Sequence, residues 1–83
     1  MPRTGADTEA LVRYLVESLV DSPESVSIDV QEAEGGLRFE ITLDTADVGK
    51  VIGRGGRIIK AIRTLARAAG STQELMVDVE VVG

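Results

Sequence analysis

The chain has 83 residues and a net charge of −5, and 43% of its residues are hydrophobic and 28% charged, which is the composition of one small folded domain. It contains no cysteine and no histidine, so it lacks disulfides, thiolate metal ligands and the most common general base, which disfavours an enzyme and implies no cofactor. No apolar run approaches the ~20 residues that span a bilayer, and the first six residues lack the apolar stretch of a signal peptide, so we expect a cytoplasmic protein without membrane insertion.

The N-terminal part of the chain predicts a flexible leader at residues 1–7, followed by a single domain at residues 8–83. From Thr8 to Asp21, leucine and valine recur at the spacing of a helix with one apolar side, and Asp7 or Thr8 can serve as its N-cap. The helix is expected to end at Ser22, because a residue before proline is kept out of the α region.

Two alternating runs of apolar and polar residues, 26–31 and 37–43, have the period of half-buried strands. Between them, Gly35 and Gly36 allow a tight reversal of the chain, so the two strands are expected to form an antiparallel hairpin. Each strand has one polar side, and one face of the sheet is therefore expected to stay in contact with water.

The second half of the chain predicts two helices and a strand. The helices span about Ala46 to Ile52 and Arg57 to Ala69, with a glycine turn between them and Gly70 at the end of the second. Alternation from residue 75 to 81 predicts the last strand, which can lie parallel to the second strand because the helices provide a crossover. The predicted fold class is α+β, in the order α-β-β-α-α-β, with a three-stranded mixed sheet and helices packed on one face. The buried stripe expected on the second of these helices consists of Ile58, Ile62, Leu65, Ala66 and Ala69.

Basic residues are concentrated near the glycine turn. Six of the nine lie within residues 50–67, a window without any acidic residue, which carries +6 while the rest of the chain carries −11. Because salt screens distant charges, such a local positive face can bind a polyanion although the whole chain is acidic. The six are Lys50, Arg54, Arg57, Lys60, Arg63 and Arg67.

The glycine turn, "GRGG" at residues 53–56, has the spacing of a G-x-x-G loop between two helices. A phosphate-binding P-loop would need a Gly-Lys-Ser/Thr ending, and a dinucleotide site would need G-x-G-x-x-G directly after a strand; neither spacing is present. In a G-x-x-G loop, Gly53 can end the first helix in a left-handed conformation, and Gly56 can let the backbone pass closely. Arg54 can project between them, bare Gly55 lets a phosphate approach, and the amides that open the second helix are expected to be free to donate to it.

The stretch "GKVIGRGGRIIKAIRTLARAA", residues 49–69, resembles the V-I-G-x-x-G-x-x-I-x-x-I signature of KH RNA-binding domains. The predicted order of elements is similar to the type II, or prokaryotic, KH arrangement. Over about residues 8–82, the chain resembles the small stand-alone KH proteins of bacteria (the KhpA or YlqC type). The residues that match the signature are Val51, Ile52, Gly53, Gly56, Ile59 and Ile62.

This resemblance implies binding of single-stranded RNA, with the G-x-x-G loop clamping about four nucleotides of backbone and the bases in an apolar groove between the helices and the sheet edge. It also implies pairing with a second KH-containing protein (the KhpB, Jag or EloR type), with self-association left open, and a role as a post-transcriptional regulator or chaperone-like factor in cell elongation and division. The residues that it assigns to the RNA site are Lys50, Ile52, Gly53, Arg54, Gly55, Gly56, Arg57 and Lys60.

Three alternatives stay open. The KH fold could mainly dock a partner protein, or the basic helix could lie on an anionic membrane, although it carries no Trp or Phe. Arg63 and Arg67 could belong either to the RNA site or to a solvated helix face.

Tyr14 and Phe39, the only aromatic residues, are expected to pack within the fold, so RNA binding is expected to be weak, salt-dependent and without strong sequence preference.

Overall fold

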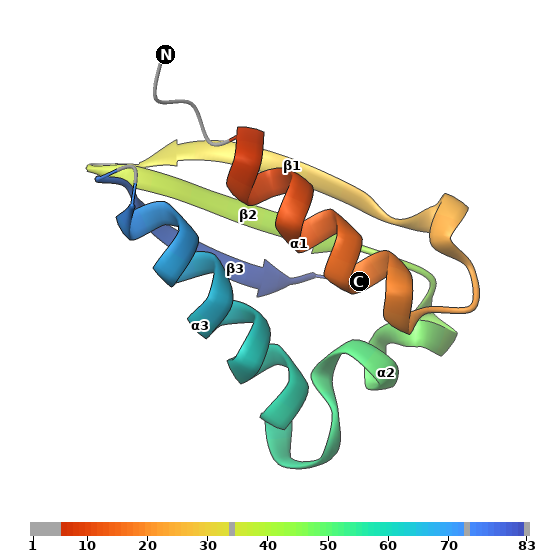
Figure 1. The fold of residues 1–83 in the computed structure, drawn as a ribbon. Helices are drawn as coiled ribbons and strands as arrows, with labels where there is room; N and C mark the ends of the chain where they lie inside the picture. The colour runs from red at the N-terminus through yellow and green to blue at the C-terminus, as the bar shows by residue number, and fades with distance from the viewer. Residues whose placement is uncertain (1–5, 34, 73, 83) are drawn as a thin grey trace.

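The computed structural model describes residues 6–33, 35–72 and 74–82, which form a sheet with helices on one side (Figure 1). In these ranges, the α-helices are α1 (Ala6–Leu19), α2 (Val48–Ile52) and α3 (Arg57–Ser71), and the strands are β1 (Ser27–Ala33), β2 (Gly36–Thr42) and β3 (Met76–Val81). Short 3-10 turns occur in the connections as η1 (Pro23–Ser25), η2 (Thr45–Asp47) and η3 (Arg54–Gly56). Among the described residues, no helix is both long enough and apolar enough to cross a membrane.

The sheet has the order β1-β2-β3, with β2 in the middle. β1 pairs antiparallel with β2, so that Val30 faces Phe39, and β3 pairs parallel with β2, so that Phe39 faces Val79. The parallel pair needs a crossover, which α2 and α3 provide (Figure 1). The predicted α+β class, the order of elements and the mixed sheet are confirmed.

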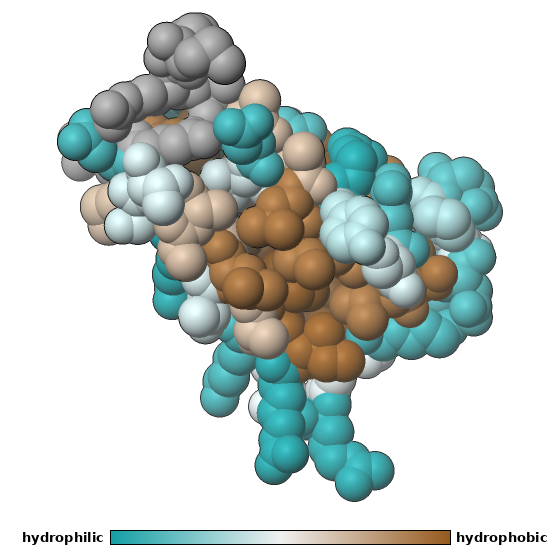
Figure 2. All heavy atoms as spheres, in the orientation of Figure 1, coloured by the Kyte–Doolittle hydropathy of each residue, from teal (hydrophilic) through white to brown (hydrophobic). Residues whose placement is uncertain are grey.

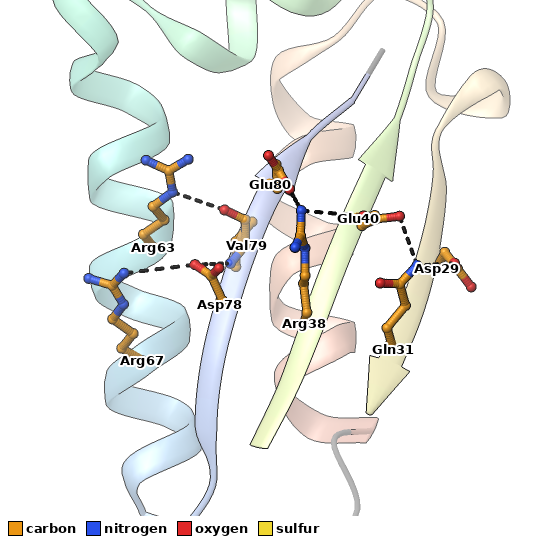
Figure 3. Close-up of polar contacts among 9 residues, drawn as sticks. All are labelled: Asp29, Gln31, Arg38, Glu40, Arg63, Arg67, Asp78, Val79 and Glu80. Atoms are coloured by element: carbon orange, nitrogen blue, oxygen red, sulfur yellow. Dashed lines mark hydrogen bonds and ion pairs between the residues drawn. The ribbon is translucent and has the colours of Figure 1, made fainter. Parts of the chain in front are cut away.

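The core lies between the sheet and the helices α1 and α3. The inner face of β2 contributes Phe39 and Ile41, which are fully buried, and α1 contributes Val12 and Val16. The expected packing of Phe39 is therefore confirmed. On the outer face of the sheet, charged side chains of β2 and β3 pair with one another in contact with solvent, as the alternation predicted (Figure 3).

Helix α1 differs from the prediction at both ends. It begins at Ala6, inside the predicted leader, and residues 1–5 of that leader lie outside the described residues. Asp7 therefore lies in the first turn of the helix, and neither Asp7 nor Thr8 is the N-cap. Negative charge in the first turn still stabilises the helix through its dipole. The helix ends at Leu19, before the proline can act on it, and Pro23 instead opens the turn η1.

Helix α3 extends two residues beyond the prediction, and its buried side is rotated. Leu65 is 48% exposed, so its predicted burial is wrong, and Ile58 and Ala69 are only half-buried. Gly70 lies inside the helix and not at its end, because it packs against β3, where a Cβ would lie 2.5 Å from a methyl group of Val77. The buried residues are Ile59, Ile62, Ala66 and Gly70.

The hairpin between β1 and β2 uses its two glycines differently. Gly35 lies in the turn with a φ of 75°, a conformation that glycine adopts at little cost. Gly36 pairs with Ala33 as the first residue of β2, and a Cβ there would overlap the backbone oxygen of Met76 in β3. The hairpin is confirmed, but close contact between strands, and not the turn, requires Gly36.

Candidate functional site

The loop between α2 and α3 lies at one end of the molecule, below both helices in Figure 1. The helix predicted from residue 46 to 52 begins with the turn η2, so α2 itself contains only five residues. Asp44 accepts a hydrogen bond from the Ala46 N–H at 2.9 Å and caps this turn. At the other end of α2, the Gly53 N–H donates to the Gly49 carbonyl at 2.9 Å. The loop therefore follows directly from a hydrogen-bonded helix end.

All three glycines of the loop have a positive φ, which is 76° at Gly53, 65° at Gly55 and 75° at Gly56. Side chains rarely allow such angles, so the path of the loop depends on these glycines. At Gly53, a Cβ would also lie 2.6 Å from the Ile58 side chain. At Gly56, the nearest atom would be 4.0 Å away, on Ile59, so the predicted close approach is wrong there and conformation alone requires glycine.

The backbone amides of the loop are partly used within it. The Gly56 N–H donates to the Gly53 carbonyl at 3.1 Å, and the Arg57 N–H donates to the Arg54 carbonyl. The expectation that the amides opening α3 are free is therefore wrong for these two. For Arg54 and Gly55, no backbone acceptor is found among the described residues, so these N–H groups are the ones available to an anion.

Arg54, Arg57 and Lys60 place positive charge beside these amides. All three are exposed, and within residues 6–33, 35–72 and 74–82 none of them has an ion-pair partner. Arg57 and Lys60 are three residues apart on α3 and so lie on the same side of the helix. Hydrophilic side chains project from this end of the molecule in Figure 2. The loop thus combines free donors with uncompensated cations, which is an arrangement suited to phosphate.

Lys50, which the resemblance also assigns to the RNA site, is bound inside the protein. Its Nζ lies 2.7 Å from Asp21 Oδ2 and 2.9 Å from Asp47 Oδ1. Hydrogen bonds to these two carboxylates, first Asp21, raise the pKa of Lys50. The hydrogen bond from Lys50 lowers the pKa of Asp47, although burial opposes this shift. Both groups stay charged at neutral pH and neutralise each other, so the geometry does not support Lys50 as a phosphate ligand.

Arg63 and Arg67, whose role the sequence leaves open, connect α3 to β3 (Figure 3). Arg63 Nε donates to the Val79 carbonyl at 2.9 Å, and Arg67 lies 3.8 Å from the carboxylate of Asp78. The same carboxylate accepts a hydrogen bond from the Val79 N–H at 3.1 Å. Arg63 therefore helps to hold the helix against the sheet, whereas Arg67 forms an exposed ion pair that contributes little to stability. Because both side chains reach toward β3, we do not place them in the anion site.

Val51 and Ile52 support the loop from its apolar side. Val51 is fully buried, and Ile52 is half-buried and packs against the core. These two side chains fix α2, and with it the start of the loop, to the body of the domain. Ile52, assigned to the RNA site with the glycines, lies next to Gly53 and leaves part of its side chain accessible.

An apolar groove of about 390 Å³ lies between α1 and α3, and Arg57 forms part of its lining. Tyr14 is 70% exposed here, so its predicted packing within the fold is wrong. Figure 2 shows apolar surface over these two helices, beside the hydrophilic end of the molecule. The sequence did not distinguish this surface from the core, because apolar residues at helical spacing usually face inward. The large apolar residues that line the groove are Tyr14, Leu15, Leu19, Ile58, Ile62 and Leu65.

Curated proteins from several bacteria are similar to most of this chain. RNA-binding protein KhpA of Listeria monocytogenes is 40% identical over 74 residues, which cover 89% of this chain and 97% of that protein. RNA-binding protein KhpA of Clostridium perfringens is 42% identical over 72 residues, covering 87% of this chain and 96% of that protein. RNA-binding protein KhpA of Oceanobacillus iheyensis is 48% identical over 61 residues, covering 74% and 81%. These relatives are named for RNA binding and not for a reaction.

Solved structures with a similar fold include Era in complex with a segment of 16S ribosomal RNA, at a TM-score of 0.68 and 23% identity. The match covers 99% of this chain and 32% of the Era chain, so this chain spans only a third of that protein, and the likeness concerns the fold alone. Era of Aquifex aeolicus bound to GDP and aluminium fluoride gives a TM-score of 0.62. The family model for the KH domain of KhpA/KhpB matches residues 9–81. With a type II KH fold and an open G-x-x-G loop, the chain belongs to the KhpA/KhpB KH-domain family.

Proposed function

We propose that this protein binds single-stranded RNA and that the loop at residues 53–56 clamps the phosphate backbone. The observation that carries the proposal is the open loop, in which the free N–H groups of Arg54 and Gly55 lie beside exposed cations. Backbone amides and arginines together are common ligands of phosphate. Relatives that are named RNA-binding proteins support the same function.

The proposed site keeps all but one of the residues that the resemblance assigns. Lys50 is left out because it is paired with two carboxylates. Ile52 supports the loop from its half-buried position and offers an apolar edge to a base. The proposed contacts to RNA are made by Gly53, Arg54, Gly55, Gly56, Arg57 and Lys60.

Backbone contacts are proposed to dominate the affinity, because Phe39 is buried and Tyr14, the one exposed aromatic residue, lies on α1 and not in the loop. Such binding is weak and has little sequence preference, which suits a chaperone-like or post-transcriptional regulator in the cytoplasm. Family membership supports a partnership with a second KH protein of the KhpB, Jag or EloR type, in the control of cell elongation and division. Joining two weak sites would raise the affinity without any new contact.

Binding is expected to weaken with salt in proportion to the number of phosphates that the loop neutralises. Three contacts, from Arg54, Arg57 and Lys60, give a slope of log K against log salt of about −2, since each phosphate of a single strand contributes about −0.7. Fluorescence anisotropy with a labelled single-stranded RNA at several salt concentrations measures this slope. If the folded protein binds no RNA even at low salt, the proposed function is wrong.

A matched pair of variants on α3 tests the location of the site. Lys60→Gln removes a free cation and is expected to reduce the slope by about 0.7. Arg67→Gln removes the same charge from a side chain that is paired with Asp78, and is expected to leave the slope unchanged. Equal effects of the two changes would show that RNA senses only the overall charge of α3, which would contradict the clamp.

The apolar groove favours a second function, the docking of another KH domain, for which we propose a second copy of this chain as the occupant. Helix α1 carries Asp7, Glu9 and Glu17 against a single basic residue, whereas α3 carries only basic residues among its charged positions. A two-fold axis that set α1 of each copy against α3 of the other would bring a net acidic helix to a net basic one. Within the groove itself the one charged lining residue is Arg57, and Glu9 and Glu17 on α1 pair with Arg13. The apolar lining of the groove supplies the area that such contacts bury.

Leu65→Glu is expected to prevent this association, because it places a charge in the apolar lining of the groove. Ala68→Glu adds the same charge at an exposed position of α3 outside the groove and serves as the control. Light scattering is expected to give the mass of a dimer for the wild type and for Ala68→Glu, and the mass of a monomer for Leu65→Glu. A monomeric wild type that forms a one-to-one complex with a second KH protein would assign the groove to that partner instead.

A further inference from the structure

Asp47 is a buried carboxylate that ties the end of α1 to the start of α2. Asp47 is only 1% exposed, and no other charged residue in the described part of the chain is buried. Oδ1 accepts from the Asp21 N–H at 3.2 Å and Oδ2 from the Ser22 N–H at 3.0 Å. Oδ1 also lies 2.9 Å from Lys50 Nζ. A buried charge is tolerated only when its hydrogen bonds are made, and here three donors converge on one side chain.

Helix α2 depends on such support because it is too short to be stable by itself. Its five residues, Val48–Ile52, form little more than one turn, and isolated helices of this length do not persist in water. One end of α2 is fixed by Asp47 and Lys50, and the other end leads into the glycine loop through Gly53. The direction of α2 therefore sets where the loop begins.

We propose that Asp47 is a positioning residue for RNA binding, which holds the G-x-x-G loop in place through α2 without touching the RNA. This inference rests on the proposed function. Asp47 acts through two connections, the backbone of residues 21–22 and the ammonium group of Lys50, which itself reaches Asp21 Oδ2 at 2.7 Å. The three charged groups form one cluster that joins the segment after α1 to the helix before the loop.

The direction in which Asp47→Asn changes the affinity for RNA distinguishes a positioning role from a purely electrostatic one. Asp47→Asn removes a negative charge near a polyanion site and releases Lys50 from one of its two partners. If charge alone mattered, RNA would bind more tightly. If Asp47 positions the loop, the variant binds RNA about ten-fold more weakly, since a small displacement of recognition groups is enough for a loss of this order.

Asp44→Asn is the matched control for this experiment. It removes the same charge three residues earlier, from an exposed side chain, and asparagine can still accept the hydrogen bond from the Ala46 N–H. Its affinity for RNA is expected to equal that of the wild type or to exceed it slightly. Anisotropy titrations with one single-stranded RNA at fixed low salt, at a temperature where circular dichroism shows all three proteins folded, provide the comparison.

NMR relaxation of the loop amides supplies a readout that a loss of overall stability would not produce. In Asp47→Asn, the order parameters of Gly53, Gly55 and Gly56 are expected to fall while those of the second half of α3 stay unchanged. Tighter or unchanged RNA binding by Asp47→Asn, or an unchanged loop, would overturn the positioning role. A wild type that binds no RNA would instead overturn the proposed function.

Discussion

The double variant Arg54→Asp with Gly55→Asp is expected to lose RNA binding by about a hundred-fold at low salt. The two changes replace one positive charge by two negative charges next to the free amides of the loop. In water, each unit charge about 4 Å from a phosphate changes the binding energy by about 1 kcal/mol, so three units account for a loss of this size. Anisotropy with single-stranded RNA measures the effect.

The fold of this variant is expected to persist, because Arg54 is exposed and a Cβ at Gly55 would meet no atom within 4 Å. Aspartate also tolerates the left-handed angles of Gly55 better than most residues do. Arg54→Gln with Gly55→Asn has a similar shape without the added negative charge. Its affinity for RNA is expected to fall only about five-fold, because it removes one positive charge and adds no negative one. If the folded double aspartate variant binds RNA as tightly as the wild type, the loop is not the site.

Gly36→Ala is expected to lower the free energy of unfolding by about 3 kcal/mol, at the upper end of the cost of overpacking. The added Cβ would overlap the backbone oxygen of Met76, and neither strand can move without disturbing the pairing of β2 with β3. Since a small domain has a total stability of only about 5–15 kcal/mol, the loss is a large fraction of it. Urea denaturation followed by circular dichroism gives this free energy.

Gly49→Ala is the control for that measurement. Gly49 is exposed in α2, and a Cβ there would meet nothing within 4 Å. Alanine also favours a helix over glycine by up to about 1 kcal/mol, so this variant is expected to be as stable as the wild type or more stable. If Gly36→Ala unfolds at the same urea concentration as the wild type, the close approach of β3 to Gly36 does not constrain the sheet.

Local patterns were sufficient to predict the architecture. Strict alternation around Phe39 identified the central strand, and the two helices before β3 required a crossover, which gave the parallel pairing. The helix ends were less predictable. Pro23 marks where α1 cannot continue, but the helix stops earlier, at Leu19, and the close approach of Val77 keeps Gly70 inside α3. Such contacts depend on tertiary packing and leave no periodic signal.

The largest difference from the prediction is the side of α3 that is buried. This helix has apolar residues on two sides, one facing the core and one facing the groove. Ile59 and Ala66 are buried in the core, whereas Leu65 belongs to the groove shared with α1. The predicted stripe mixed residues of both kinds, since a period of 3.6 fits either side. The exposed position of Tyr14 on α1 escaped prediction for the same reason.

Charge alone could not identify the cations of the site. The sequence placed six basic residues in one window, but a side chain is available to a ligand only if no internal partner binds it. Lys50 and Arg63 are bound to acceptors that are remote in the sequence, Asp21 and the Val79 carbonyl. The sequence also missed Asp47, whose only signal was an acidic residue one helical turn before Lys50.

The middle of the outer edge of β3 is occupied by the protein's own side chains. At Val79, the middle of the strand, the carbonyl accepts from Arg63 and the N–H donates to Asp78 (Figure 3). An unpaired edge normally invites another chain to add a strand and extend the sheet, which is a route to aggregation. Here an added strand would have to break both hydrogen bonds at its centre. At Val79, this edge therefore offers no free backbone group with which an added strand could pair.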